Sequence, residues 1–277
     1  MKKLLGIALA SAAAGLCLSA LKKASDEQTV ELSPVKRSSP NKKAILVVSF
    51  GTSYAQTREK TIGAIEEDFR SAFPEYTIRR AFTSKMIIKK LRERDGIEVD
   101  TVAQALEKLE AEGYSTVICQ PTHVMGGFEF DDVKREVENW KGRFDHIACG
   151  WPLLTSSEDY EQVTEALVQE FSDIPSDAAL VLMGHGTEHP ANATYPALDY
   201  RLKARGCKNF FVGTVEGYPD LQTVMQEVAA IHASKVFLAP LMVVAGDHAI
   251  NDLCGEEEDS WKSCFEQAGY QTEPILK

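Results

Sequence analysis

Short apolar runs alternate with longer amphipathic stretches along most of the chain. Each apolar run is continuous instead of alternating with polar residues, which is typical of strands buried on both faces of a parallel sheet. The expected strands cover residues 44–50, 76–82, 116–121, 145–150, 178–184, 209–215 and 235–240. The expected helices cover residues 55–73, 84–94, 100–113, 130–141, 157–172, 192–205, 220–232 and 256–268. This alternation predicts an α/β fold with parallel sheets and right-handed crossovers.

The same short loop motifs occur twice between these elements, once in each half of the chain. A Gly-Thr pair follows the first strand of each half, within SFGTS and within GHGTE. Later in each half, PTHVMGG and PLMVVAG share a proline that is followed six residues on by a glycine. This register sets Phe50 against His185 and Glu129 against His248. The chain is therefore predicted to contain a duplicated α/β unit.

The duplication predicts two similar domains, at residues 43–155 and 156–277. Each is expected to be a parallel sheet flanked by helices, and the two are expected to face each other across a central cleft. In open α/β sheets, ligands bind beyond the carboxyl ends of the strands. The strand ends of both halves are therefore the places to look for chemistry.

The beginning of the chain has a different character. In residues 1–21, two lysines precede an apolar stretch rich in Ala and Leu, which is typical of a signal peptide or a membrane anchor. Residues 22–42 are polar, contain Ser and Pro, and show no helical apolar stripe, so a flexible linker is expected. The protein is therefore expected to be periplasmic or otherwise exported, with a membrane tether through its N-terminus as one form of export.

Composition narrows the class of partner. Hydrophobic residues make up 44% and charged residues 26% of the 277 positions, which suits a soluble core. The formal net charge of −11 argues against a nucleic-acid partner, because a nucleic-acid groove needs clustered Lys and Arg. Five of the six cysteines lie beyond the first apolar stretch and no CxxC pair occurs, so no disulfide framework is implied. A homo-oligomer is left open.

Three side chains of the second half that can bind a metal follow successive expected strands. They are His185, Glu216 and His248. A single loop histidine is most often only a polar surface residue, but neighbouring parallel strands would bring these three together. Two imidazoles and one carboxylate suit a borderline divalent ion. The glycines on either side of His185, Gly184 and Gly186, are expected to leave room for a flat ligand.

Two further histidines are weaker candidates. His123 lies in a strand-end loop of the first half and could line the cleft. His189 follows His185 by four residues, but Pro190 argues against a continuous helix there. His189 is therefore expected to contact a substrate or to anchor its own loop.

From about residue 43 to its end, the chain resembles the class II chelatases, and among them the anaerobic sirohydrochlorin cobaltochelatases of the CbiK type. The resemblance is carried, in order, by VVSFGTS, QPTHVMGGFEFDDV, MGHGTEHPAN, GTVEGYP and APLMVVAGDHAINDLCG. It implies a lyase with two similar α/β domains around a cleft. It also implies that His185 and His248 are the site histidines and that Glu216 is the accompanying carboxylate, with all three in catalytic and metal-binding roles.

The resemblance further implies the substrates. The metal would be Co²⁺, with Fe²⁺, Ni²⁺ or Zn²⁺ as alternatives, and no other cofactor is required. The tetrapyrrole would be sirohydrochlorin or precorrin-2, in cobalamin or related tetrapyrrole biosynthesis. Two pyrrole protons must leave as the metal enters, and neutral imidazole is a suitable acceptor. The candidates for holding substrate carboxylates are Arg58, Arg79, Arg80 and Lys85.

Two other functions compete with the chelatase. The export signal favours a carrier of a metal or a tetrapyrrole that keeps the chelatase fold without turnover. A metallohydrolase would need further ligands and an activated water, and the sequence contains no HExxH or similar pattern. The intact set of His185, Glu216 and His248 favours the enzyme over both.

Overall fold

The computed structural model describes residues 42–276 of the chain, apart from residues 245 and 247. The chain divides into two compact units, which meet in the sequence at Thr155 and Ser156. We call the described residues up to Thr155 the first unit and those from Ser156 onward the second unit. The N-terminal segments expected to be a signal and a linker lie, up to residue 41, outside the described residues.

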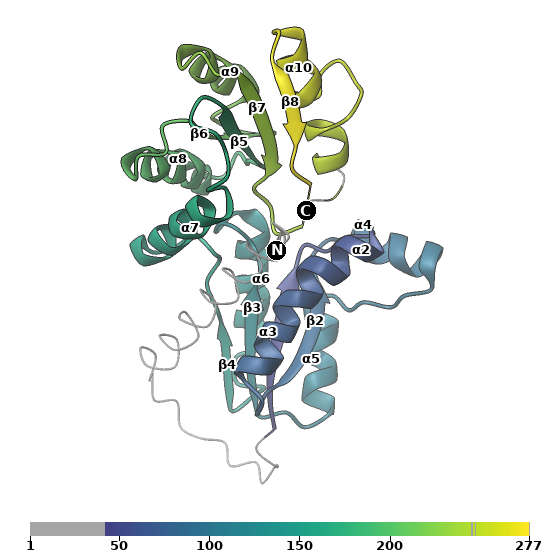
Figure 1. Ribbon diagram of the computed structural model, residues 1–277. Coiled ribbons are helices and arrows are strands. Elements are labelled where there is room, and N and C mark those ends of the chain that lie inside the picture. Colours follow the sequence, from purple (N-terminus) through teal and green to yellow (C-terminus); the bar gives the residue numbers. More distant parts are fainter. Residues whose placement is uncertain (1–41, 245, 247, 277) are drawn as a thin grey trace. The chain divides into compact units, whose positions relative to one another are not determined.

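The first unit is built on a four-stranded parallel sheet (Figure 1). Its strands are β1 (Lys43–Ser49), β2 (Thr77–Phe82), β3 (Thr116–Pro121) and β4 (His146–Cys149). Their order is β2-β1-β3-β4, and all neighbours run parallel. Its helical elements are α2 (Ala55–Arg58), η1 (Glu59–Gly63), α3 (Ala64–Ala72), α4 (Lys85–Lys90), η2 (Leu91–Asp95), α5 (Val102–Ala111) and α6 (Phe128–Asn139).

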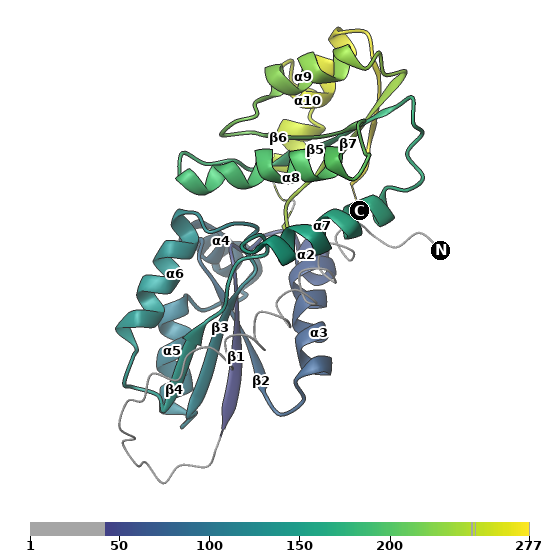
Figure 2. The ribbon, with the colours of Figure 1, turned by 90° about the vertical axis from the view of Figure 1, so that its left-hand side faces the viewer.

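Helices cover both faces of this sheet (Figure 2). On one face, Leu46 of β1 joins Leu106 of α5 and Val133 of α6 in one buried cluster. The next residue, Val47, is also fully buried and points to the opposite face, which α3 covers. Because both faces are covered, the positions between the two ends of the central strand, Ala44 to Val48, are all apolar. This explains why its apolar run is continuous.

The second unit repeats this architecture. Its strands are β5 (Ala179–Gly184), β6 (Phe210–Thr214), β7 (Lys235–Pro240) and β8 (Gln271–Pro274). Their order is β6-β5-β7-β8, again parallel throughout. Its helical elements are α7 (Ser157–Glu170), η3 (Pro190–Ala193), α8 (Thr194–Ala204), α9 (Leu221–Ala230), η4 (Ala249–Leu253) and α10 (Trp261–Gln267). The predicted fold class, two parallel sheets flanked by helices, is confirmed.

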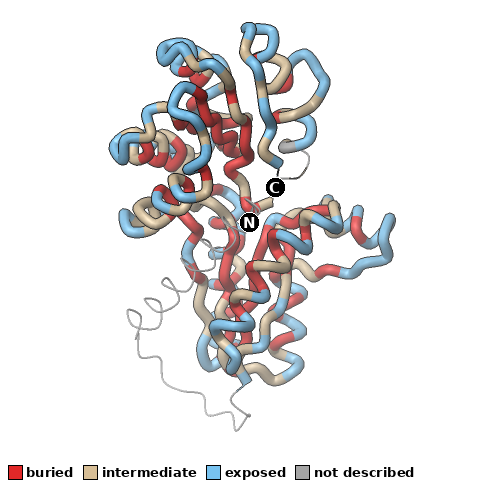
Figure 3. The backbone as a smooth tube through the Cα atoms, in the orientation of Figure 1, coloured by how far each residue is buried: buried red, intermediate tan, exposed pale blue. Residues whose placement is uncertain are grey.

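The core of the second unit also has two layers. Val181 of β5 packs with Val228 of α9 and Phe265 of α10 in one buried cluster. On the other face lies α8, whose Leu198 is fully buried. The central strands of both units are buried along their length, as the red segments in Figure 3 show. Across the described residues, none of the helices combines the length and the apolarity that a membrane crossing needs.

The end of the chain differs from the sequence prediction in two ways. The eighth strand, β8, was not predicted, because its residues are polar and mostly exposed and it pairs only with β7 at the sheet edge. The helix expected over residues 256–268 begins only at Trp261. Its N-cap is Ser260, whose hydroxyl accepts a hydrogen bond from the Ser263 N–H. The acidic run before Ser260 therefore precedes the helix and does not form its first turn.

Candidate metal centre

The three predicted metal-binding residues come together at the carboxyl edge of the second sheet. His185 follows the central strand β5, Glu216 follows β6 on one side, and His248 follows β7 on the other. One ligand atom from each side chain lies within 4.8 Å of the others. The two imidazole rings lie edge to face, with centroids 4.6 Å apart. The Nδ1 atom of His185 lies 3.7 Å from a carboxylate oxygen of Glu216.

The hydrogen bonds of the two imidazoles determine which nitrogen can bind a metal. Nδ1 of His185 lies 3.0 Å from the carbonyl oxygen of Gly186, and Nδ1 of His248 is hydrogen-bonded to the carboxylate of Asp252. Carbonyl and carboxylate oxygens only accept, so both Nδ1 atoms carry the proton. The lone pair of each ring is then on Nε2. Each ring is therefore in the tautomer that can coordinate an ion through Nε2.

Solvent can reach this cluster. The side chains of His185 and Glu216 are 44% and 58% exposed, and that of His248 is 36% exposed. A metal ion from solution could therefore enter without opening the core of the unit. Partial exposure also lowers the cost of keeping the Glu216 carboxylate charged before an ion arrives.

Backbone hydrogen bonds hold the His185 loop against the Glu216 loop. The Val215 N–H donates to the Gly184 carbonyl over 3.1 Å, and the Glu216 N–H donates to the His185 carbonyl over 2.8 Å. These bonds extend the β5–β6 pairing beyond the last residues of the two strands. The spacing between the His185 and Glu216 side chains is therefore set by the sheet itself.

Asn192 fastens the same two loops from the other side. Its side-chain oxygen accepts a hydrogen bond from the Thr187 N–H, and its side-chain amide donates to the Tyr218 carbonyl. A Cβ atom on Gly217 would come within 2.4 Å of the Asn192 amide oxygen, so this position must be glycine for the contact to form. Asn192 was not among the residues singled out from the sequence, because its partners are backbone groups, which leave no sequence signal, and one of them is 26 residues away.

The space beside the two glycines next to His185 is filled by other residues, so their lack of a side chain does not itself make room for a flat ligand. A Cβ atom on Gly184 would lie 2.2 Å from the ring of Tyr195, so the tyrosine already fills that space. A Cβ atom on Gly186 would lie 2.7 Å from the backbone nitrogen of Gly217. The buried Tyr195 hydroxyl accepts hydrogen bonds from the backbone N–H groups of His185 and Gly186. The glycines thus allow close packing that fixes His185 in place.

The other two histidines have separate roles. The Nδ1 atom of His189 accepts a hydrogen bond from the Ala191 N–H and caps η3, so His189 anchors its own loop. His123 belongs to the first unit, and both of its ring nitrogens are buried without a hydrogen-bond partner among the described residues. Burial lowers the pKa of His123 to about 4, and the nearby charge of Glu129 opposes that shift only in part.

This burial of His123 predicts a pH-dependent stability. The unfolded histidine takes up a proton near pH 6.5, whereas the folded one resists protonation until about pH 4. The unfolded state therefore binds more protons between these values, and the free energy of unfolding falls as the pH drops through that window. Once the pH is below both pKa values, the loss in the free energy of unfolding reaches about 3 kcal/mol. Urea unfolding of the full chain and of His123→Leu, each at pH 7 and pH 4.5, measures it. Equal losses in both proteins would contradict it.

The first unit carries different residues at the positions that correspond to the metal ligands. Val48 pairs with Pro121, as Met183 pairs with Pro240, so Phe50 of the first unit corresponds to His185. The same register sets Ser84 against Glu216 and agrees with Glu129 opposite His248. Ser84 caps α4 and accepts a hydrogen bond from the Ile87 N–H. Of these three positions in the first unit, only the one with Glu129 keeps a carboxylate or imidazole that could bind a metal.

Exposed apolar side chains stand at the same edge of the first sheet. Phe50 follows β1, Met86 lies just beyond β2, and Trp151 follows β4, and all three are exposed. Large apolar side chains at the carboxyl ends of several strands are unusual for a surface that faces only water. This edge is therefore suited to contact with an apolar ligand.

Most of the basic residues expected to hold substrate carboxylates are engaged within the first unit. The Arg58 guanidinium is buried and donates to the Thr52 carbonyl. Arg79 pairs with Glu112, and Arg80 makes two hydrogen bonds to the Glu66 carboxylate. The remaining candidate is Lys85, which lines a hollow on the surface of the first unit.

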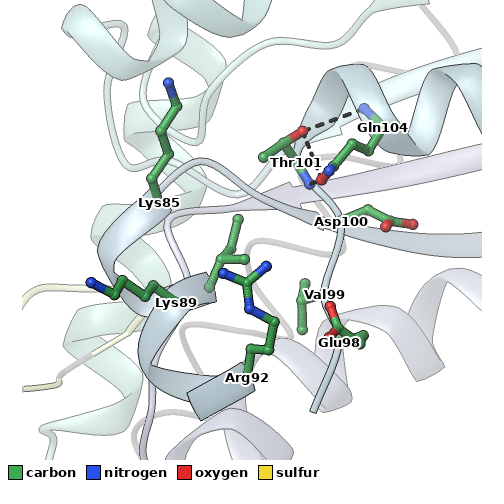
Figure 4. A pocket seen from close by; sticks show the side chains of 9 residues that line it. Lys85, Lys89, Arg92, Glu98, Val99, Asp100, Thr101 and Gln104 are labelled. Atoms are coloured by element: carbon green, nitrogen blue, oxygen red, sulfur yellow. Dashed lines mark hydrogen bonds between the residues drawn. The ribbon is translucent and has the colours of Figure 1, made fainter. Parts of the chain in front are cut away.

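Lys85 lines a hollow of about 240 Å³ beside α4 and η2 (Figure 4). Lys89 and Arg92 extend from the same helical segment, and Glu98 and Asp100 come from the connection to α5. The mixture of cationic and anionic side chains leaves little net attraction for an anion. This hollow contains none of the three predicted metal-binding residues.

The sequence of the chain is similar to those of known proteins. The model of the cobalt chelatase (CbiK) family matches residues 43–277. The sirohydrochlorin cobaltochelatase of Salmonella typhimurium is 45% identical over 235 residues, covering 85% of this chain and 89% of that protein. The sirohydrochlorin cobaltochelatase CbiKC of Nitratidesulfovibrio vulgaris is 34% identical over 249 residues, covering 89% of this chain and 87% of that protein.

Solved structures give the same fold. SirB from Bacillus subtilis with Fe³⁺ aligns with a TM-score of 0.57 at 15% identity, covering 84% of this chain and 88% of that one. The sirohydrochlorin chelatase SirB from Bacillus subtilis subspecies spizizenii in complex with cobalt aligns with a TM-score of 0.55 at 15% identity, covering 85% and 88%. At this identity the likeness concerns the fold alone.

Proposed function

Because the chain belongs to the CbiK family of cobalt chelatases, we propose that it inserts Co²⁺ into sirohydrochlorin and releases two protons. Fe²⁺ is the alternative metal and precorrin-2 the alternative tetrapyrrole. The reaction would serve cobalamin or related tetrapyrrole biosynthesis. It needs no soluble cofactor beyond the metal, which is a substrate.

The observation that carries this proposal is the convergence of His185, Glu216 and His248. Two Nε2 lone pairs and a carboxylate oxygen would coordinate Co²⁺, and the Glu216 charge would offset part of the charge of the ion. As the four ring nitrogens of the macrocycle take over the metal, two N–H protons must leave. The imidazoles released from the metal are then free to accept those protons, so one cluster supplies both the metal and the base.

The first unit offers features that suit the macrocycle. Phe50, Met86 and Trp151 provide exposed apolar surface at the carboxyl edge of its sheet. A tetrapyrrole is flat and largely apolar, with carboxylate side chains at its rim. Contact with such surface would bind the ring by burial of apolar area, without contributing to the chemistry at the metal.

An absorbance assay separates the enzyme from the carrier. Sirohydrochlorin and Co²⁺ are mixed with protein at a concentration far below that of the tetrapyrrole, and the uncatalysed reaction is subtracted. A chelatase converts many equivalents of tetrapyrrole per protein. A change in spectrum that stops at one equivalent would contradict turnover and would favour the alternative, an exported carrier of a metal or a tetrapyrrole.

We also propose that the protein is exported, on the strength of the basic, then apolar, then polar order of residues 1–43. The exported protein would be periplasmic or tethered to a membrane through its N-terminus. Fractionation of cells that make the full-length chain tests this. Recovery of the protein entirely in the cytoplasm, with Met1 intact and no membrane association, would contradict it.

A further inference from the structure

We propose that Asp252 is a positioning residue for metal insertion, which holds the imidazole of His248 so that its Nε2 atom faces the incoming ion. This inference rests on the proposed role of His248 as a metal ligand. Asp252 would not touch the metal or the tetrapyrrole. Its effect would pass entirely through the orientation and the tautomer of His248.

The contact itself is direct. Nδ1 of His248 lies 2.5 Å from Oδ2 of Asp252, and the two residues are four positions apart on the same helical turn. A charged carboxylate accepts more strongly than a neutral carbonyl. It therefore stabilises the tautomer with the proton on Nδ1 and fixes the plane of the ring. Outer carboxylates of this kind orient histidine ligands in many metal sites.

The two imidazoles of the cluster are held in different ways. His185 donates to the carbonyl of Gly186 in its own loop, and the packing around Gly186 fixes that carbonyl. For the His248 ring, the hydrogen-bond partner among the described residues is the Asp252 side chain. A single side-chain substitution can therefore remove the hydrogen bond that orients His248, whereas the partner of His185 is a backbone carbonyl.

Asp252 is placed by its neighbours and not by its carboxylate. The next residue, Leu253, is fully buried and packs in the cluster that contains Phe265 of α10. The turn closes where the Gly255 N–H donates to the Asn251 carbonyl over 2.9 Å. The Asp252 side chain itself is 42% exposed. Removing its carboxylate should therefore leave the turn folded.

The first test measures Co²⁺ binding by calorimetry and insertion by steady-state kinetics. We expect Asp252→Ala to weaken Co²⁺ binding about 10- to 100-fold. The KM for Co²⁺ should rise in the same proportion, while the KM for sirohydrochlorin stays unchanged. Glu257→Ala is the matched control, because it removes one exposed carboxylate from the following connection without a contact to His248. An equal loss in both variants would indicate a general charge effect and would overturn the inference.

The second test reads the tautomer directly. In ¹⁵N NMR spectra of the metal-free protein, His248 should show the proton on Nδ1, and in Asp252→Ala a substantial share of it should move to Nε2. Asp252→Asn keeps an acceptor oxygen and should recover part of the Co²⁺ affinity. If Asp252→Ala changed neither the tautomer of His248 nor the affinity for Co²⁺, the role of Asp252 would be overturned and the proposed metal site would stand. A parental protein that binds no Co²⁺ through His248 would overturn the proposed metal site, and this inference with it.

Discussion

His185→Ala should lower the rate of Co²⁺ insertion at least about 100-fold, because it removes both a metal ligand and a proton acceptor. Binding of sirohydrochlorin should survive, since in the proposed function the ring is held mainly by contacts at its rim and by apolar contact, and not by His185. Steady-state insertion rates and equilibrium titration of the tetrapyrrole measure the two quantities separately. The fold should persist, because His185 is partly exposed and its loop is held by backbone bonds to the Glu216 loop.

His146→Ala is the matched control for this variant. His146 is an exposed histidine at the start of β4 in the first unit, and it belongs to no metal-binding cluster among the described residues. The His146→Ala protein should insert cobalt at the parental rate. A His185→Ala protein that also did so, after correction for the uncatalysed reaction, would remove His185 from the mechanism.

Gly186→Ala should have the largest effect on the geometry of the site. Gly186 has a φ of +84°, and an added Cβ atom would lie 2.7 Å from Gly217 N and 2.8 Å from Thr214 Cβ. The left-handed backbone costs about 1 kcal/mol for alanine, and the clash should bring the total to about 3 kcal/mol. Because the clash pushes the His185 loop from the Glu216 loop, Co²⁺ binding should also weaken. Urea unfolding and Co²⁺ titration measure the two effects.

Gly206→Ala separates the two causes. Gly206 has a φ of +93°, but a Cβ atom there would meet nothing within 4 Å. It should therefore cost only the backbone penalty of about 1 kcal/mol and leave Co²⁺ binding unchanged. If both variants lost the same stability and both bound Co²⁺ normally, close packing at Gly186 would not be what holds the site.

The part of the site that the sequence could predict follows from sheet geometry. His185, Glu216 and His248 each follow an apolar run, and parallel strands bring such ends to one edge whatever the loops do in detail. The loop motifs that recur in the two halves likewise predicted the duplicated α/β unit. Both inferences use only periodicity and the order of motifs, and both of these can be recognised from residues that are close in sequence.

The contacts that orient these residues were not predictable in the same way. Asp252 lies four residues after His248, but no helix was expected there, so the spacing had no structural meaning until η4 was seen. Gly186 was assigned to ligand access, whereas its neighbour in space is Gly217, from another strand end. β8 was missed because edge strands need no apolar run. In each case the deciding neighbour is distant in sequence or belongs to an unpredicted element.

The central claim is that one divalent ion binds to His185, Glu216 and His248 together. A crystal of the protein grown with Co²⁺, and measured at the cobalt absorption edge, tests it most directly. We expect an anomalous peak about 2.1 Å from the Nε2 atoms of both histidines and from a carboxylate oxygen of Glu216. A cobalt peak on other residues, with these three side chains unoccupied, would contradict the account.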